Sequence, residues 1–440
     1  MIRLIVALAL AALLSAPRAA SANGADLPAE VVLQAYVKQE EKRALLLFRV
    51  PLDLLASFGL PKRGPGYLDL ARIDERLQAV AAASARQIEL RANGAQLAPV
   101  TRHARISLLS DPSFRDYDAA RAHLEGPRLP PDTDLFWNQG FFDTMLEFPL
   151  GEAPARLSIR VNVAPELGQR LRLELEFLPL GKAPHRFALT GGSGWIALEP
   201  RWYEAAAQFA WTGVAAGATL ERLITLLCLV APFRRLRSAL LLAAAWVILQ
   251  SLALTAAPVA GLAAMRGVAA LFEGVLPAVV FLLAIGNLAA PSLRWRFLAS
   301  ALLGALGGLA LVPTLNTAWQ FSGTHPFIAA LSFNIGVALA QFGGAALAWA
   351  VLRCVVDRVL GAPLDVVVAS AVAGHLGWHW MFERGHELGH TLEHARRSEI
   401  IGIALYLLAA VLVAVACRRL PRSFFDDPRI PSLLSALKRD

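Results

Sequence analysis

Cysteine is scarce in this sequence, with three residues among 440. Cys228, Cys354 and Cys417 all lie in or beside apolar segments, and the stretch 23–200 contains no cysteine. A disulfide cannot crosslink that stretch, because it holds no thiol to oxidise. Three scattered thiols are also too few for a thiolate metal site, so this class of metal centre is excluded.

Charged residues are scarce as well. They make up 17% of the chain, whereas about a quarter is usual in soluble proteins, and hydrophobic residues make up 56%. The apolar excess begins after about residue 205, so the composition predicts a soluble domain joined to a membrane domain. The net charge of +8 comes mostly from arginine, but no basic run with interleaved aromatic residues stands out. Nucleic acid is therefore not an expected partner.

The first residues have the layout of a secretory signal peptide. They read MIRLIVALALAALLSAPRAASANG, with Arg3, a short apolar core and an Ala20-Ser21-Ala22 ending. The core is too short to span a bilayer, which predicts a signal peptide over 1–22 that is cut after Ala22. The domain that follows, over 23–200, is expected outside the cytoplasm.

Short runs of alternating polarity, broken by Pro, Gly and Asp, fill residues 23–200. Leu171, Leu173, Leu175 and Phe177, for example, alternate with charged residues in RLRLELEFLPL. Roughly seven such runs predict an antiparallel β-sandwich-like domain, interrupted by one helical insertion, LDLARIDERLQAVAAASA. The aromatic loop FWNQGFFDT is expected to be a local packing cluster, with a ligand or membrane contact as the alternative.

Seven apolar segments in the second half are each near the roughly 20 residues that a bilayer requires. The predicted spans are 206–231, 238–260, 267–290, 297–316, 326–352, 364–386 and 398–417. They place a seven-helix membrane domain at 201–420 and a tail at 421–440. The fourth span contains LGALGG, whose small residues suit close packing of helices.

Arginine is biased toward alternate connections between these spans. With the β-rich domain outside, the cytoplasmic segments carry Arg234, Arg235, Arg237, Arg294, Arg296, Arg353, Arg358, Arg418, Arg419 and Arg422. The outer connections carry only Arg266, Arg396 and Arg397. This positive-inside bias agrees with the signal peptide. It predicts a bacterial inner-membrane protein, surrounded by lipid, with a periplasmic N-terminal domain.

Five of the nine histidines lie between His375 and His394, in HLGWHWMFERGHELGHTLEH. At about 100° per residue, one helical stripe carries His375, His379, Glu383, His386, His390 and His394. Imidazoles within a bilayer suit a ladder of ligands for a divalent cation or a proton relay. The alternative is that His375 and His379, the inner pair, make interhelical hydrogen bonds. His386, His390 and His394 would then form a solvated helix end.

The same segment contains HELGH, which matches the zinc-protease pattern H-E-x-x-H. His386 and His390 would bind Zn²⁺, and Glu387 would activate water. A third protein ligand is needed, and His394 lies about 12 Å along the helix from His386. A membrane metalloprotease is therefore kept as an alternative, and this pattern is the only enzyme signal that we find.

Three segments resemble a known family. They are FNIGVALAQ from Phe333 to Gln341, GWHWM from Gly377 followed by Glu383-Arg384, and LFEGVLPAVV containing Glu273, with Asn287 downstream. With the signal peptide, the β-rich domain and the spans, they resemble the HupE/UreJ-like membrane proteins. That resemblance implies a nickel or cobalt permease of the kind associated with hydrogenase and urease systems.

The sequence departs from this family at several ligand positions. The first span carries Glu221-Arg222 in place of the family's histidines and aspartate, and the second carries Gln250-Ser251 in place of His-Ser. Ala338 replaces the glutamate that the family has after FNIGV. The sixth-span histidines are then expected to carry more of the function.

These observations predict a permease-like protein for nickel, cobalt, zinc or a proton-coupled solute, without a permanently bound cofactor. The metal residues are expected to be His375, His379, Glu383, His386 and His390. The remaining polar path is expected to involve Glu273, Asn287, Gln250, Glu221, Asn334 and Gln341. A non-transporting accessory or assembly factor, with a protein-binding periplasmic domain, is a further alternative.

Overall fold

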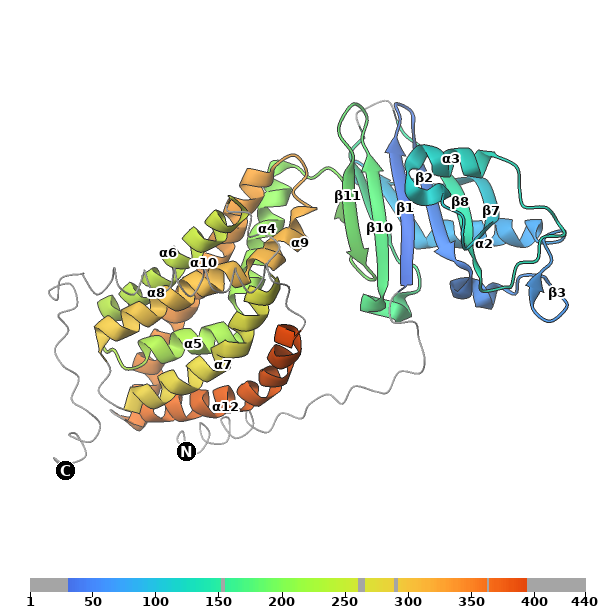
Figure 1. Cartoon of the computed structure of the whole chain (residues 1–440). Coiled ribbons are helices and arrows are strands. Elements are labelled where there is room, and N and C mark those ends of the chain that lie inside the picture. Colours follow the sequence, from blue (N-terminus) through green and yellow to red (C-terminus); the bar gives the residue numbers. More distant parts are fainter. Residues whose placement is uncertain (1–30, 152–154, 260–265, 289–291, 362–363, 394–440) are drawn as a thin grey trace, which may run out of the picture. The chain divides into compact units, whose positions relative to one another are not determined.

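The structure is a computed structural model that describes residues 31–151, 155–259, 266–288, 292–361 and 364–393. The described residues form two compact units (Figure 1). The β-unit comprises the residues up to Arg201 together with Gln320–Thr324. The helical unit comprises those from Trp202 to Trp319 and from His325 onward. The predicted signal peptide, the seventh span and the tail lie outside the described residues.

A six-stranded sheet in the order β11-β10-β1-β2-β8-β7 dominates the β-unit. Its strands are β1 (Val31–Gln39), β2 (Arg43–Pro51), β7 (Val100–Leu108), β8 (Gly140–Pro149), β10 (Leu171–Leu178) and β11 (His185–Thr190). The prediction of a wholly antiparallel domain is wrong at one pair, because β1 and β10 run parallel. A parallel pair requires a long crossover, and the chain between these two strands supplies one.

A smaller sheet in the order β12-β9-β5-β6 shares the hydrophobic core of the large one. Its strands are β5 (Ile88–Ala92), β6 (Ala95–Gln96), β9 (Leu157–Val161) and β12 (Ile196–Ala197). Leu33, Phe148 and Phe177 of the large sheet belong to the same buried cluster as Leu90 and Ile159 of the small one. A short hairpin of β3 (Lys62–Arg63) and β4 (Tyr67–Leu68) is separate.

Helices cover parts of the β-unit. They are η1 (Leu52–Phe58), α2 (Asp74–Gln87), η2 (Ser113–Arg115), α3 (Tyr117–Glu125) and η3 (Pro165–Arg170). The predicted helical insertion is confirmed from Asp74 onward as α2, but its first residue, Leu68, belongs to β4. The apolar residues of α2 pack on β7 and β8. α3 begins at an N-cap, since the Asp116 carboxylate accepts a hydrogen bond from the Ala119 N–H. Its buried side Tyr117, Ala120 and Leu124 packs over β1, β2 and β8.

The predicted aromatic loop, 136–144, is a loop only in its first part, because the residues from Gly140 onward belong to β8. The first part packs locally. Phe136 makes an edge-to-face contact with Tyr67, with 5.8 Å between the ring centroids. The Lys62 ammonium lies 4.4 Å from the centroid of the Trp137 ring. These contacts agree with the expectation of a local packing cluster.

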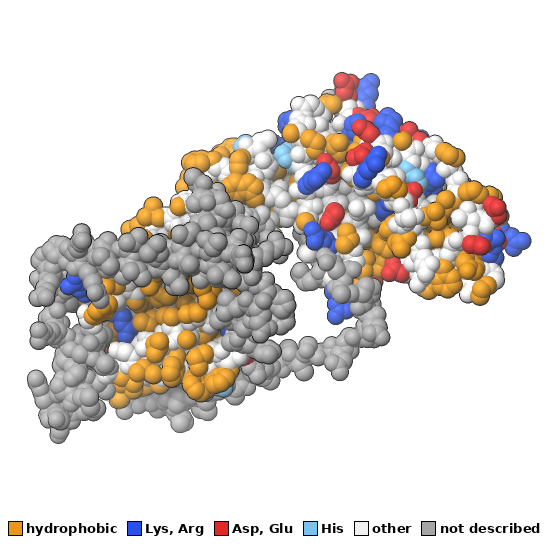
Figure 2. All heavy atoms as spheres, in the orientation of Figure 1, with side chains coloured by type: hydrophobic (Ala, Val, Ile, Leu, Met, Phe, Trp, Pro, Cys, Tyr) orange, Lys and Arg blue, Asp and Glu red, His pale blue; other side chains and the backbone are white. Residues whose placement is uncertain are grey.

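The helical unit is built from α4 (Trp202–Gly217), α5 (Leu220–Val230), α6 (Leu236–Val259), α7 (Arg266–Leu288), α8 (Leu293–Ala310), α9 (Val312–Trp319), α10 (Pro326–Val351), the π-helical turn η5 (Leu352–Val356), α11 (Asp357–Leu360) and α12 (Leu364–Glu393). On the face drawn in Figure 2, most of the coloured side chains of the helical unit are hydrophobic, whereas side chains of both charges gather on the β-unit. These properties indicate a membrane protein.

Four helices among the described residues are long and apolar enough to cross a membrane, or five if a bent pair counts as one span. They are Leu236–Ala257, Ala269–Leu288, Leu293–Trp319 and Pro326–Leu360, and the bent pair is α4 with α5, at 62°. The predicted sixth span forms the continuous helix α12 but is not among them, since its apolar run is interrupted by histidines and charges. The number seven stays a prediction.

Glycines let two helix pairs pack backbone to backbone. A Cβ at Gly304 or Gly308 of α8 would overlap the backbone of Trp246 or Gln250 in α6. Both glycines lie in LGALGG, so the predicted close packing is confirmed there. α4 and α10 meet in the same way, because a Cβ at Gly336 would overlap the carbonyl oxygen of Ala210.

Candidate functional site

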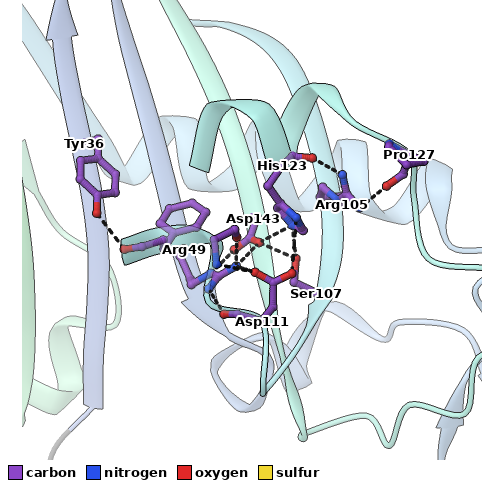
Figure 3. Close-up of polar contacts among 10 residues, drawn as sticks. Tyr36, Arg49, Arg105, Ser107, Asp111, His123, Pro127 and Asp143 are labelled. Carbon is purple, nitrogen blue, oxygen red and sulfur yellow. Dashed lines mark hydrogen bonds and ion pairs between the residues drawn. The ribbon is translucent and has the colours of Figure 1, made fainter. Parts of the chain in front are cut away.

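A buried polar cluster lies in the β-unit between the large sheet, η2 and α3 (Figure 3). We call it the Arg49 cluster: Arg49, Ser107, Asp111, His123 and Asp143. Arg49 is 3% exposed and Asp143 is 0% exposed. Arg49 Nε and Nη2 each donate to the Asp143 carboxylate, at 2.7 Å. This two-point pairing satisfies both buried charges.

The other hydrogen bonds of Arg49 hold the strand β2 to the start of η2 and to the loop before it. Nη1 donates to the Asp111 carbonyl oxygen at 3.0 Å, and Nη2 donates to Ser113 Oγ at 3.0 Å. The guanidinium also lies 4.2 Å from the centroid of the Phe114 ring. The arginine therefore links three segments that are far apart in the sequence.

Ser107, His123 and Asp111 lie in the order of a nucleophile, a base and an orienting acid. Ser107 Oγ is 2.7 Å from His123 Nε2, and His123 Nδ1 is 3.4 Å from Asp111 Oδ2. Ser107 is only 1% exposed, however, and its hydroxyl donates to Asp143 Oδ2 at 2.5 Å. A carboxylate at this position would repel the oxyanion of an acyl-transfer reaction. This geometry does not suit Ser107 as a nucleophile, and the contacts of the cluster join β2, β7, β8, α3 and the loop before η2.

The electrostatics of the cluster follow from burial and pairing. Burial lowers the pKa of Arg49, but hydrogen bonds and charge from Asp143 and Asp111 outweigh this effect and raise it above its ordinary value. Burial raises the pKa of Asp111, but hydrogen bonds from Ser113 and the neighbouring His123 and Arg49 lower it overall. Both groups are therefore held in their charged forms.

The motifs and periodicities of the sequence do not predict this cluster. One signal was present: Asp143 interrupts an apolar strand, GFFDTMLEFP, where a carboxylate is costly unless it is paired. The partner could not be read from the sequence, because Arg49 is 94 residues away.

The histidine segment forms the middle of α12. The rings of His375 and His379 are adjacent, with centroids 4.6 Å apart and planes at 75°. Both histidines are exposed, and so is Glu383. The opposite side of the helix packs on α7, where a Cβ at Gly377 would lie 2.9 Å from the Pro277 carbonyl oxygen. The inner pair therefore lies away from the α7 contact.

His386 and His390 belong to α12, but their side chains lie outside the described residues, as does His394.

Across the helical unit, Arg384 of α12 approaches two of the predicted polar-path residues. Its Nη2 donates to Glu221 Oε1 at 3.3 Å, and its Nη1 lies 4.0 Å from Glu273 Oε2. The structure thus brings Glu221 and Glu273 together through an arginine that was not predicted to line the path.

Gln250 and Gln341 form a closed amide pair between α6 and α10. Each side chain donates to the other, at 2.8 and 3.0 Å, and the Trp246 indole donates to Gln341 Oε1 at 2.9 Å. Gln250 and Gln341 are 1% and 0% exposed. Their side-chain amides therefore bond to each other at the contact between α6 and α10.

Asn287 of α7 bridges two further helices. Its Nδ2 donates to Ser370 Oγ of α12 at 3.1 Å, and its Oδ1 accepts a hydrogen bond from Arg296 Nη2 of α8 at 2.6 Å. Asn334 of α10 is 9% exposed, and its Oδ1 has no hydrogen-bond partner in the described part of the chain. The predicted path residues thus fall into separate groups.

Within the described ranges, no group of three or more His, Cys, Asp or Glu side chains is placed to hold a metal ion. His375 and His379 supply two adjacent imidazoles, and any third metal ligand has to come from elsewhere.

A comparison with protein-family models finds no match, and a comparison with curated proteins finds none either. The resemblance to the HupE/UreJ-like proteins therefore stays a prediction.

Proposed function

We propose that this chain is a permease-like membrane protein of the HupE/UreJ type that handles a divalent transition metal or a proton-coupled solute. Nickel, cobalt and zinc are the candidate ions, because neutral imidazole is a good ligand for all three. The apolar helices support a place in a membrane. We further propose that the protein has seven spans and lies in a bacterial inner membrane, with the β-unit in the periplasm and the tail in the cytoplasm.

The observation that carries the proposal is the exposed pair His375 and His379 on α12. Imidazole is costly to place against hydrocarbon, so an exposed pair on a membrane helix needs a polar neighbour: water, an ion or another polar segment. Because the two rings are one helical turn apart, they offer two metal-binding nitrogen atoms on the same side of α12. An ion passing along α12 would meet this pair.

The test is the metal content of cells that lack the gene and carry it again on a plasmid. We expect deletion to lower cellular nickel, cobalt or zinc, measured by mass spectrometry, and the wild-type chain to restore it. His379→Ala should fail to restore it, because one of two adjacent donors is lost. His103→Ala, at an exposed histidine of β7, is the matched control. Full restoration by His379→Ala, at equal protein level, contradicts the proposal.

A second candidate is a non-transporting accessory or assembly factor whose β-unit binds a protein. The Gln250–Gln341 pair favours it, since two residues predicted to line a path instead bond to each other. In this case His375→Ala and His379→Ala are tolerated, whereas removal of residues 23–200 abolishes function. The two candidates are thereby separated by the same complementation assay.

A further inference from the structure

The outer face of the large sheet is hollowed on its β11 side. A cavity of about 450 Å³ lies there, within the range of small-molecule sites. Its floor comes from β1, β10 and β11, and its sides include Phe114 and Arg115 of η2 and Gln320. All of these residues belong to the β-unit. The cavity is separate from the α12 histidines and from the Arg49 cluster.

The register of the strands explains the hollow. Glu174 of β10 lies opposite Gln34 on one side and Ala188 on the other. Gln34, Glu174 and Ala188 thus form one row across β1, β10 and β11. Because Ala188 has a small side chain, space is left above the sheet at that position. Beyond it, the Gln320 amide pairs with the exposed edge of β11: the Ala188 N–H donates to Gln320 Oε1 at 2.6 Å. A carboxylate therefore lies in the middle of a row that has an amide at each end.

Charges of both signs line this cavity. Glu174 and Glu176 are two residues apart on β10 and point to the same face of the sheet. Arg172 precedes them on the same strand, Arg186 lies opposite Glu176 on β11, and Arg115 of η2 also lines the cavity. Neighbouring carboxylates suit an ammonium group, and guanidinium groups suit a carboxylate.

The ion pairs already present are weak enough to be replaced. Arg172 Nη2 is 3.4 Å from Glu174 Oε1, with the two side chains 46% and 50% exposed. Arg186 Nε is 3.2 Å from Glu176 Oε2, with the two side chains 81% and 20% exposed. Exposed pairs of this kind contribute about 0–1 kcal/mol, so a ligand that offers both charges loses little by displacing them.

We infer that this cavity binds a zwitterion: a free amino acid, or a short peptide that presents its N-terminal ammonium and its C-terminal carboxylate together. Glu174 takes the ammonium, the arginines take the carboxylate, and Tyr36 and Phe114 face the carbon skeleton. The inference goes beyond metal handling and does not depend on it.

The test measures binding to the full chain in detergent micelles by calorimetry. The probes are L-alanine, L-lysine, L-glutamate and the dipeptide Ala-Ala, with acetate and methylamine as single-charge controls. We expect at least one zwitterion to bind and both controls to bind more weakly. Binding of amino acids identifies the free ligand, and binding of Ala-Ala alone identifies a peptide.

Glu174→Gln should weaken binding by about tenfold or more, the loss expected for one charge-assisted contact. Glu75→Gln, at an exposed acid of α2 outside the cavity, is the matched control and should bind as the wild type does. Both changes are on the surface, so each variant is expected to fold. No binding of any zwitterion, equal binding of acetate or methylamine, or unchanged binding by Glu174→Gln overturns the inference.

Discussion

Asp143 shows how a single side chain organises the β-unit. Its carboxylate has no exposed surface and accepts hydrogen bonds from Arg49 and Ser107. Arg49 in turn bonds to the carbonyl of Asp111. Nearby, burial raises the pKa of Tyr36 to about 12, and its hydroxyl donates to the Phe114 carbonyl oxygen at 2.7 Å. These buried groups connect η2 to the sheet.

We predict that Asp143→Asn destabilises the protein strongly, because it leaves the Arg49 guanidinium buried without its main counter-charge. The expected loss is about 3 kcal/mol, or roughly 6–12 °C in Tm for a domain of this size. Thermal unfolding of the full chain in micelles, followed by circular dichroism, measures it. Asp132→Asn, in an exposed loop, is the control and should change Tm little. A small effect at position 143 would mean that the pair contributes no more than a surface ion pair.

Among the helices, the α4–α10 contact depends on small residues at defined positions. Added Cβ atoms at Gly213 and Gly336 would overlap the carbonyl oxygens of Phe333 and Ala210. In lipid, helix association relies on this close van der Waals packing, because hydrocarbon provides no hydrophobic driving force between helices. The two backbones can approach only while both positions remain glycine.

We predict that Gly336→Ala loosens the helical unit, whereas Gly343→Ala on the same helix does not. A Cβ at Gly343 meets nothing within 4 Å, so alanine there gains about 0.5–1 kcal/mol of helix propensity without a clash. The readout is the thermal unfolding of the two purified variants in the same detergent. Equal Tm values would show that α4 and α10 do not pack as described.

On the scale of the whole molecule, the chain joins a charged β-unit to an apolar helical unit. Arg234 and Asp357 pair at 3.0 Å beside the buried Asp365, which also pairs with Arg353. All four lie in or next to the connections that the arginine bias predicts to be cytoplasmic. That prediction places the β-unit on the opposite side of the membrane, and the labelling experiment below tests it.

We predict that a cysteine in α3 reacts from outside the cell and one in α11 does not. Asp118→Cys and Arg358→Cys would be placed singly in a chain whose native cysteines are replaced by alanine. In spheroplasts, a membrane-impermeant maleimide should label the first directly and the second only after permeabilisation. The reverse pattern would invert the topology, and labelling of both would indicate that the segments between them do not separate two compartments.

The sequence by itself determined the division into two parts, the α2 helix, the apolar helices and the glycine-mediated packing of LGALGG. Each depends on local pattern: period-two alternation, long apolar runs, or small residues at helical spacing. The stripe of His375, His379 and Glu383 was also readable, because helical geometry places them on one side.

Only the tertiary structure decided which distant residues meet. The parallel β1–β10 pair, the Arg49–Asp143 pair and the bridge from Arg384 to Glu221 join residues that are far apart in the chain. Gln250 and Gln341 were both recognised as polar residues in spans, but their mutual pairing depends on how α6 and α10 pack. Local sequence fixes the direction of a side chain on its own element, and the contact it makes depends on what the fold brings opposite it.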